Sequence, residues 1–171
     1  MSFKNQYILS KSKIVQPNHT NHLEFGKFNL YVSEEINIFT HNGNVVLLGY
    51  VFHCYNSKSE QELLEHLLSL DENERLDEID EWCGHFVLIM DEKNPKIYTD
   101  ACSSFKVFYG KINNKTIIGS DPKTLCKFFN FTLDADNEKE IFYSSEYFLK
   151  NNTKVGHDTR YTNMYQLVSN H

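Results

Sequence analysis

Residues 84–109, GHFVLIMDEKNPKIYTDACSSFKVFY, decide the fold class of this 171-residue chain. Three short apolar runs, at 85–90, 96–99 and 105–109, are separated by turn-like polar residues such as those at 91–95. Runs of this length, divided by turns, are typical of antiparallel strands that follow one another in a sheet. We therefore predict a meander of neighbouring antiparallel strands over this stretch.

The residues before this stretch also predict extended structure. Residues 45–52 are continuously apolar, which predicts a strand buried on both faces and placed beside the meander. Shorter strands are expected at 6–9, 28–32 and 35–39, where apolar residues run together or alternate with polar ones. The polar residues 16–23 predict a loop.

A helix is predicted over residues 59–69. Ser57 and Ser59 each stand three residues before a glutamate, which is the spacing of an N-terminal capping box. Four leucines then recur at helical spacing between residues 63 and 68. The leucines are expected to face the core, and one of the two serines to cap the helix.

A second helical pattern follows the first. It places Leu76, Ile79, Trp82 and Cys83 on one side and acidic residues on the other. Further elements are predicted as a helix that begins at Asp121, a helix over 138–150 and a last strand over 161–168. Strands and helices in this order predict an α+β fold in which helices pack on sheets.

Composition indicates one globular domain over residues 1–171. Hydrophobic residues make up 40% of the chain, which is enough for a sizeable core. The net charge is −6 and Arg75 and Arg160 are the only arginines, which argues against a nucleic-acid-binding protein. No apolar run is long enough to span a bilayer, and the four cysteines lack C-x-x-C spacing. A cytoplasmic protein with reduced thiols and no membrane partner is therefore expected.

The middle of the chain carries five short motifs in a characteristic order. They are 59–64 (SEQELL), 84–91 (GHFVLIMD), 100–109 (DACSSFKVFY), 120–125 (SDPKTL) and 161–171 (YTNMYQLVSNH). With these motifs the chain resembles the N-terminal class II glutamine amidotransferase domain of asparagine synthetase-related proteins, a domain of the N-terminal nucleophile hydrolase type. The resemblance covers about residues 45–171 and fades toward the start of the chain.

This resemblance implies a fold, an activity and a partner. The implied fold is a four-layer αββα sandwich of antiparallel sheets. In the family a second domain follows, which uses ATP and magnesium to activate a carboxylate and then accepts ammonia from glutamine, as in asparagine biosynthesis. The resemblance thus implies no cofactor in this chain, and a synthetase domain, in cis or in trans, as its partner. A homodimer is a further arrangement that it leaves open.

The start of the chain departs from the family's catalytic pattern. Family members expose an N-terminal cysteine, whose thiolate attacks the amide while its own α-amine acts as the base. Here Ser2 would be the first residue after removal of the methionine, and it precedes the first apolar strand, near Tyr7, by several residues. Ser2 is therefore the one candidate for an N-terminal nucleophile. Because it precedes the first strand by several residues, we expect it instead to be a solvent-exposed N-terminal residue without a catalytic role.

The glutamine pocket of the family is also altered. Where family members have Asn-Gly-Glu-Ile, this chain has Leu48, Gly49, Tyr50 and Val51, so that only the glycine matches. Glu60 stands where the family has the aspartate that binds the substrate's amino group, and no arginine lies between residues 22 and 48 to bind its carboxylate. Gly49, Tyr50 and Glu60 thus mark a degenerate glutamine pocket, and the chain alone is predicted to be inactive.

Other candidate sites are explained more simply by packing or solvation. They are His19 with His22 as metal ligands, Cys83 with His85 as nucleophile and base, His53 with Cys54 as the wall of a remodelled cleft, and the acidic residues of 72–80. No metal site is predicted. Two functions remain: a degenerate glutaminase-like domain kept as scaffold or interface of an amide-forming ligase, or a free-standing pseudo-enzyme that binds a protein or a small molecule.

Overall fold

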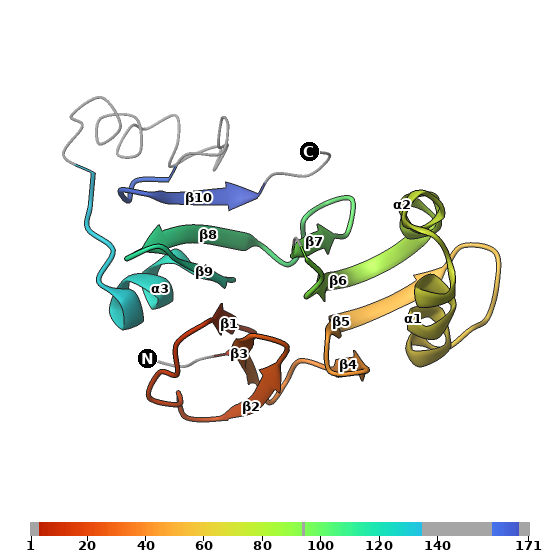
Figure 1. The fold of residues 1–171 in the computed structure, drawn as a ribbon, viewed down its shortest axis with the longest axis horizontal. Helices are drawn as coiled ribbons and strands as arrows, with labels where there is room; N and C mark the ends of the chain where they lie inside the picture. Colours follow the sequence, from red (N-terminus) through yellow and green to blue (C-terminus); the bar gives the residue numbers. More distant parts are fainter. Residues whose placement is uncertain (1–3, 94, 135–158, 168–171) are drawn as a thin grey trace.

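The computed structural model describes residues 4–93, 95–134 and 159–167. Within them, two antiparallel sheets have the strand orders β10-β8-β9-β1-β3-β2 and β4-β5-β6-β7. Figure 1 shows the six-stranded sheet on the left and the four-stranded sheet on the right. The strands are β1 (Tyr7–Ser10), β2 (Thr20–Phe25), β3 (Phe28–Ser33), β4 (Ile38–His41), β5 (Val45–His53), β6 (Trp82–Met90), β7 (Lys96–Thr99), β8 (Val107–Ile112), β9 (Lys115–Gly119) and β10 (Met164–Leu167).

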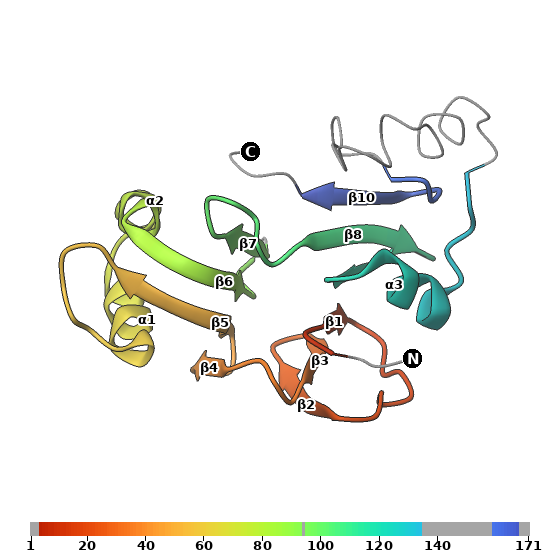
Figure 2. The same ribbon diagram turned by 180° about the vertical axis from the view of Figure 1, so that it is seen from behind.

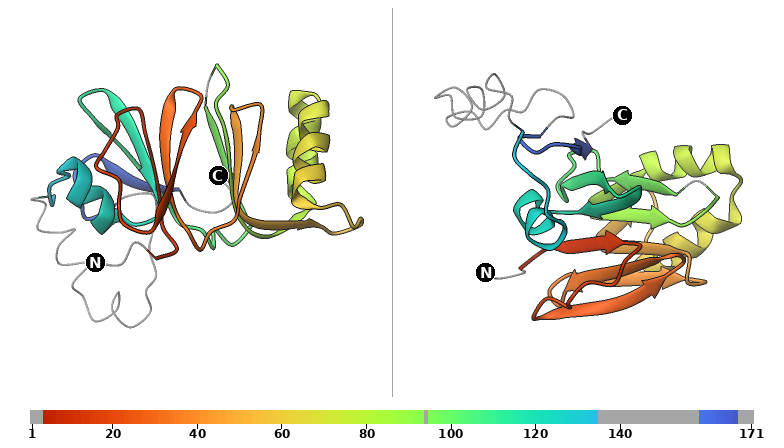
Figure 3. Two further views of the ribbon diagram at one scale, coloured as in Figure 1. Left: turned by 90° about the horizontal axis from the view of Figure 1, so that it is seen from below. Right: turned by 60° about the vertical axis from the view of Figure 1, so that its left-hand side comes forward.

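The largest core lies between the two sheets. Val46 and Leu48 of β5, with Val87 and Ile89 of β6, pack against apolar residues of β1, β3, β8 and β9, and all four are buried. Burying one such side chain stabilises the fold by about 1.5–3 kcal/mol. The left panel of Figure 3 shows the two sheets edge-on and face to face. This packing is the main source of stability of the fold.

Among the described residues, three short helices lie outside the sheets: α1 (Glu60–Ser69), α2 (Glu72–Asp80) and α3 (Pro122–Phe129). Leu63, Leu64 and Leu67 of α1 are fully buried and pack with the outward-facing side chains of β5 and β6. Leu125 of α3 is buried in a third cluster, beside residues of β1, β8 and β9. Seen from behind, in Figure 2, α1 and α2 again lie beyond the four-stranded sheet, on the side away from the six-stranded one.

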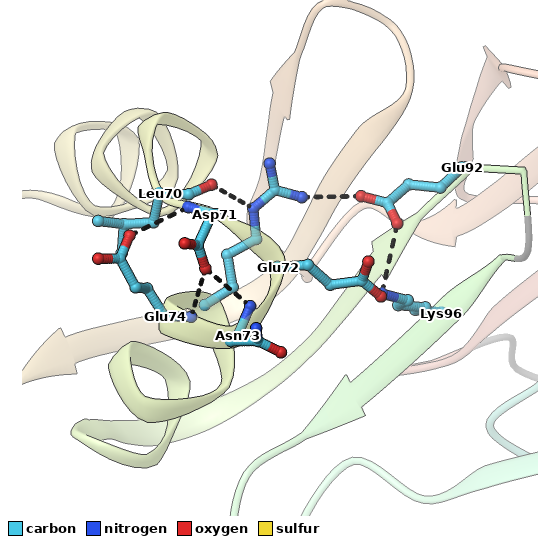
Figure 4. Close-up of polar contacts among 8 residues, drawn as sticks. Leu70, Asp71, Glu72, Asn73, Glu74, Glu92 and Lys96 are labelled. Atoms are coloured by element: carbon cyan, nitrogen blue, oxygen red, sulfur yellow. Dashed lines mark hydrogen bonds and ion pairs between the residues drawn. The ribbon is translucent and has the colours of Figure 1, made fainter.

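Ionic and polar contacts join α2 to the β6–β7 turn (Figure 4). Arg75 donates from Nε to the Leu70 carbonyl at 3.0 Å and from a terminal nitrogen to Glu92 at 2.8 Å. Lys96 at the start of β7 binds Glu72, and its Nζ lies 3.5 Å from Glu92. Each acidic side chain of this group thus contacts a basic one, and these ion pairs together attach α2 to the β6–β7 hairpin.

The expectation of an α+β, four-layer αββα sandwich is wrong. The structure is mostly antiparallel sheet, and its helices of 10, 9 and 8 residues are too short and too few to form two outer layers. Trp82, predicted to continue the second helix, instead begins β6, because α2 ends at Asp80. The predicted helix over 138–150 lies outside the described residues.

Two further predictions about strands are wrong. The strand predicted at 105–109 does not neighbour β7, because β8 belongs to the six-stranded sheet, where it pairs with β9 and β10. Residues 16–23, predicted to form a loop, include the first part of β2, an edge strand whose two end residues are buried and whose middle is mostly exposed and polar. A polar edge strand is difficult to distinguish from a loop by sequence.

Several local predictions are confirmed. Ser59 caps α1, and its capping box with Glu62 is complete. The strand predicted over 96–99 is β7, and the predicted run over 45–52 forms most of β5, which pairs with β6 as expected. Membrane-spanning helices are absent from the part of the chain that the structure describes.

Candidate functional site

A cavity of about 510 Å³ lies where the inter-sheet core ends. Its walls come from β5 and β6 of the four-stranded sheet, from the loops that connect the two sheets, and from residues just outside β1 and β9. The lining comprises Asn5, Gly49, Tyr50, His85, Ser120 and the segments 35–37 and 104–106. Of the predicted site residues, the structure thus brings Gly49 and Tyr50 together at one cavity.

Gly49 is required at the cavity wall for steric reasons. Its φ of +97° is unfavourable for other residues, and its N–H donates to the Asn37 carbonyl at 2.9 Å. A Cβ atom added there would lie 2.1 Å from the carbonyl oxygen of His85 and 2.7 Å from Cε2 of Phe105. The glycine therefore lets β5, β6 and the 104–106 loop approach one another at the cavity.

On the inner side of β5, the side chain before Gly49 lies in the inter-sheet core and the one after it lines the cavity. Leu48 is fully buried between the sheets, whereas Tyr50, on the same side of the strand, is 47% exposed. Tyr50 pairs across the sheet with His85, and their rings stack with centroids 5.5 Å apart. This exposed pair forms an aromatic wall of the cavity.

The N-terminal segment reaches the cavity and is held there by hydrogen bonds. Asn5 lines the cavity, and the next two residues are anchored to the region that begins α3. Thr124 donates from Oγ1 to the Gln6 side chain at 2.8 Å, and the Tyr7 N–H donates to Ser120 Oγ at 3.0 Å. Ser2, the predicted nucleophile, lies outside the described residues.

The Tyr7 hydroxyl connects the buried core to the 104–106 loop. It donates to the carbonyl of Lys106 at 3.3 Å, and complete burial raises the pKa of Tyr7 far above its usual value. The phenol is therefore neutral and acts as a structural donor rather than as a base.

Glu60, the third predicted pocket residue, is not among the residues that line the cavity. It is the first residue of α1 and is half-buried, with its helix packed on the outer side of the four-stranded sheet. The structure therefore separates Glu60 from the cavity that contains Gly49 and Tyr50.

Sequence reasoning missed the loop residues of the cavity, because no local pattern places them there. Ser104 is positioned by Asp100, whose buried carboxylate accepts the backbone N–H groups of Cys102 and Ser104 and the Ser104 hydroxyl. The only signal was the motif 100–109, which contains both Asp100 and Ser104. An aspartate that directly follows a strand, such as Asp100, often binds the backbone of the next loop, and this signal could have pointed to residues 102–104.

The two serine hydroxyls on the cavity wall already have structural partners. Ser104 Oγ donates to Asp100 at 2.9 Å, and Ser120 Oγ accepts the Tyr7 N–H. A serine nucleophile needs a free base within hydrogen-bond reach. The ring of His85 stacks on Tyr50, and the Asp100 carboxylate beside Ser104 also accepts the backbone N–H groups of Cys102 and Ser104. Glu35 and Lys106 are the charged groups among the described lining residues. This arrangement suits the binding of a polar molecule better than nucleophilic attack.

The other candidate sites have structural explanations. His22 stacks on Tyr31 with centroids 4.6 Å apart, and His19 lies 3.9 Å from Glu34, while no group of three metal-ligating side chains occurs among the described residues. Within the acidic stretch 72–80, Glu78 is not solvated as predicted. Its carboxylate, which is 13% exposed, accepts the Trp82 indole N–H at 3.1 Å and lies 3.6 Å from both His53 and His66.

A second, larger hollow of about 630 Å³ lies over β8, β9 and β10. Tyr109, Lys111 and Tyr165 are among its lining residues, and the Tyr109 and Tyr165 rings are 5.6 Å apart. None of the predicted pocket residues lines it, so the smaller cavity is the better candidate for a ligand site. No protein-family model and no curated protein sequence matches this chain.

Proposed function

We propose that this chain is a glutaminase-like domain of an asparagine synthetase-related, ATP-dependent amide-forming ligase, and that it does not hydrolyse glutamine. Its role is then that of a scaffold or interface for a synthetase domain, in cis or in trans, and ATP and magnesium are used by that partner. The observation that carries the predicted loss of activity is that the cavity's two serine hydroxyls, on Ser104 and Ser120, are both in structural hydrogen bonds.

The chemistry of amide hydrolysis explains why this cavity is inactive. The reaction needs a nucleophile with a base and hydrogen-bond donors aimed at the developing oxyanion. Leu48 stands where the family has an amide donor, and it faces the inter-sheet core. Losing one oxyanion donor typically lowers the rate by about 10²–10³-fold. The missing donor and the occupied serines each support the proposal.

A glutamine hydrolysis assay tests this proposal. We expect the purified chain to release no glutamate from glutamine above background, and Ser2→Ala to give the same trace as wild type. Turnover that disappears in Ser2→Ala would establish an N-terminal serine nucleophile and overturn the proposal. Turnover that persists in Ser2→Ala would point to another nucleophile and would also overturn it.

The cavity itself favours the second candidate, a free-standing domain that binds a small molecule. Its volume of about 510 Å³ and its Tyr50–His85 stack suit a small polar ligand with a flat group. Calorimetric titration with L-glutamine and L-aspartate tests this reading. Binding that is lost in Tyr50→Ala, without association with a synthetase domain, would favour it over the ligase scaffold.

A further inference from the structure

Two thiols meet at the end of the β5–β6 ladder, away from the residues that line the cavity. The Sγ atoms of Cys54 and Cys83 are 3.2 Å apart and share a hydrogen bond. Cys83 lies in β6 opposite Phe52, while Cys54 follows β5 and donates its N–H to the Glu81 carbonyl at 3.1 Å. The two cysteines are thus diagonal neighbours on adjacent strands, where side chains on one face can touch.

The surroundings of the pair leave it open to reagents. Cys54 is exposed and Cys83 is half-buried, so one thiol is accessible and the other is held directly behind it. A disulfide has a bond length of about 2.05 Å, so the sulfurs must approach by only about 1.2 Å. Cys54 stands in a turn just beyond β5, where the backbone is not held by ladder bonds on both sides. A small shift of this turn brings the sulfurs together.

We propose that Cys54 and Cys83 form a redox-active dithiol, which low-molecular-weight disulfides such as oxidised glutathione convert to an intramolecular disulfide. The Cys54 thiolate attacks one sulfur of glutathione disulfide, forming a mixed disulfide and releasing one glutathione thiolate. The Cys83 thiolate then attacks the Cys54 sulfur of this mixed disulfide and displaces the second glutathione as a thiolate. The two glutathione thiolates take up the two protons that the cysteines lost, so one disulfide forms as one is reduced.

The environment sets how this reaction depends on pH. The hydrogen bond that the protonated Cys54 thiol shares with Cys83 is the main cause that raises the pKa of Cys54, and the carboxylate of Glu81, just after α2, raises it further. Because the thiolate is the attacking form, the dithiol reacts slowly near neutral pH and faster as the pH rises. The raised pKa therefore slows oxidation of the pair near neutral pH.

The disulfide would lock the strands that carry the cavity's aromatic wall. Tyr50 and His85 lie on the same two strands, two to four residues from the thiols, and are paired with each other. A covalent link at the end of the ladder would restrict the opening of this end of β5 and β6. Oxidation of the two cysteines would therefore restrict the motion of the strands that carry Tyr50 and His85 at the cavity.

Thiol mapping of the intact chain tests the proposal. The reduced protein is incubated with oxidised glutathione, alkylated and analysed by peptide mass spectrometry. We expect a Cys54–Cys83 cross-link, with neither Cys102 nor Cys126 in an intramolecular disulfide. Because the second thiol is held beside the first, the mixed disulfide on Cys54 should be at least about tenfold rarer than that on Cys102.

Matched variants separate the dithiol from a simple exposed cysteine. In Cys83→Ser, the reaction should stop at a glutathione adduct on Cys54, while Cys102→Ser, which removes an exposed cysteine elsewhere, should cross-link like wild type. Circular dichroism verifies that each variant is folded. A stable glutathione adduct on Cys54 of the wild type, or a cross-link that forms only in denaturant, would overturn the proposal.

Discussion

Asp91, at the residue scale, connects the two sheets through one carboxylate. One of its oxygens accepts the Lys27 N–H at 2.9 Å, in the β2–β3 turn, and the other lies 2.7 Å from the Lys27 ammonium. The Asp91 side chain is only 8% exposed. The acid that ends the motif 84–91 therefore has a structural task, which is to hold a turn of the six-stranded sheet against β6.

We expect Asp91→Ala to lower the free energy of unfolding by about 2–3 kcal/mol, because it leaves the Lys27 groups without their charged acceptor. Urea denaturation measures the change. Lys93→Ala, an exposed residue two positions further on, is the control and should stay within about 0.5 kcal/mol of wild type. Equal losses in the two variants would show that the carboxylate does not hold the sheets together.

Gly49 and Gly43 allow the crowding at the cavity to be separated from backbone strain. Both have positive φ, +97° and +68°, but an added Cβ meets His85 and Phe105 at Gly49 and nothing within 4 Å at Gly43. Alanine in such a conformation costs about 1–2 kcal/mol at either site. We expect Gly49→Ala to lower the unfolding free energy by at least about 2 kcal/mol more than Gly43→Ala, since backbone atoms must move. Similar losses in urea denaturation would contradict a tight approach of β6 and the 104–106 loop at Gly49.

The N-terminal cap of α1 makes the first prediction at the element scale. The sequence offers Ser57 and Ser59 at equivalent spacing, and the structure assigns the cap to Ser59, which donates to and accepts from Glu62. We expect Ser59→Ala to destabilise the protein by about 1 kcal/mol and Ser57→Ala to have no measurable effect. Thermal unfolding of the two variants measures this difference. A larger loss for Ser57→Ala would assign the helix start to the earlier serine.

The elements that could be predicted from sequence are those whose signal is local. The helix α1 has a cap and a leucine pattern within one segment, and β5 has an unbroken apolar run. The position of β8 could not be predicted, because its partners β9 and β10 are chosen by pairing across the fold rather than by its own residues. Local pattern identifies a strand but does not say which sheet it joins.

The candidate site was predictable only in part, for the same physical reason. Gly49 and Tyr50 were assigned through the family resemblance, which was aligned on the apolar run that forms β5, whereas Ser104 is positioned at the cavity by Asp100. Glu60 was assigned by resemblance alone and lies in α1, outside the cavity lining. Similarly, Cys54 and Cys83 are 29 positions apart, and only the pairing of β5 with β6 brings their thiols together.

At the scale of the whole molecule, the C-terminal strand mainly completes the fold. Met164 is buried, and Leu167 packs against the inter-sheet core, as expected if the last strand simply extends the six-stranded sheet through β8. Tyr165 is different, because it is 39% exposed and lies beside Tyr109 at the larger hollow. If the chain is the scaffold that we propose, this exposed tyrosine is the part of β10 that can contact a partner.

Association with a synthetase domain therefore makes the last prediction. An aromatic anchor at the centre of an interface typically contributes about 2 kcal/mol or more, so Tyr165→Ala should weaken the affinity for a synthetase-domain partner by about 30-fold. Tyr55→Ala is the matched control, because Tyr55 is also an exposed tyrosine but follows β5 of the four-stranded sheet, whereas β10 belongs to the six-stranded one. Calorimetry measures both affinities, with circular dichroism to verify the fold. Equal affinities of wild type and Tyr165→Ala would remove β10 from the interface, because a tyrosine that contacts the partner cannot be truncated without loss of buried apolar surface.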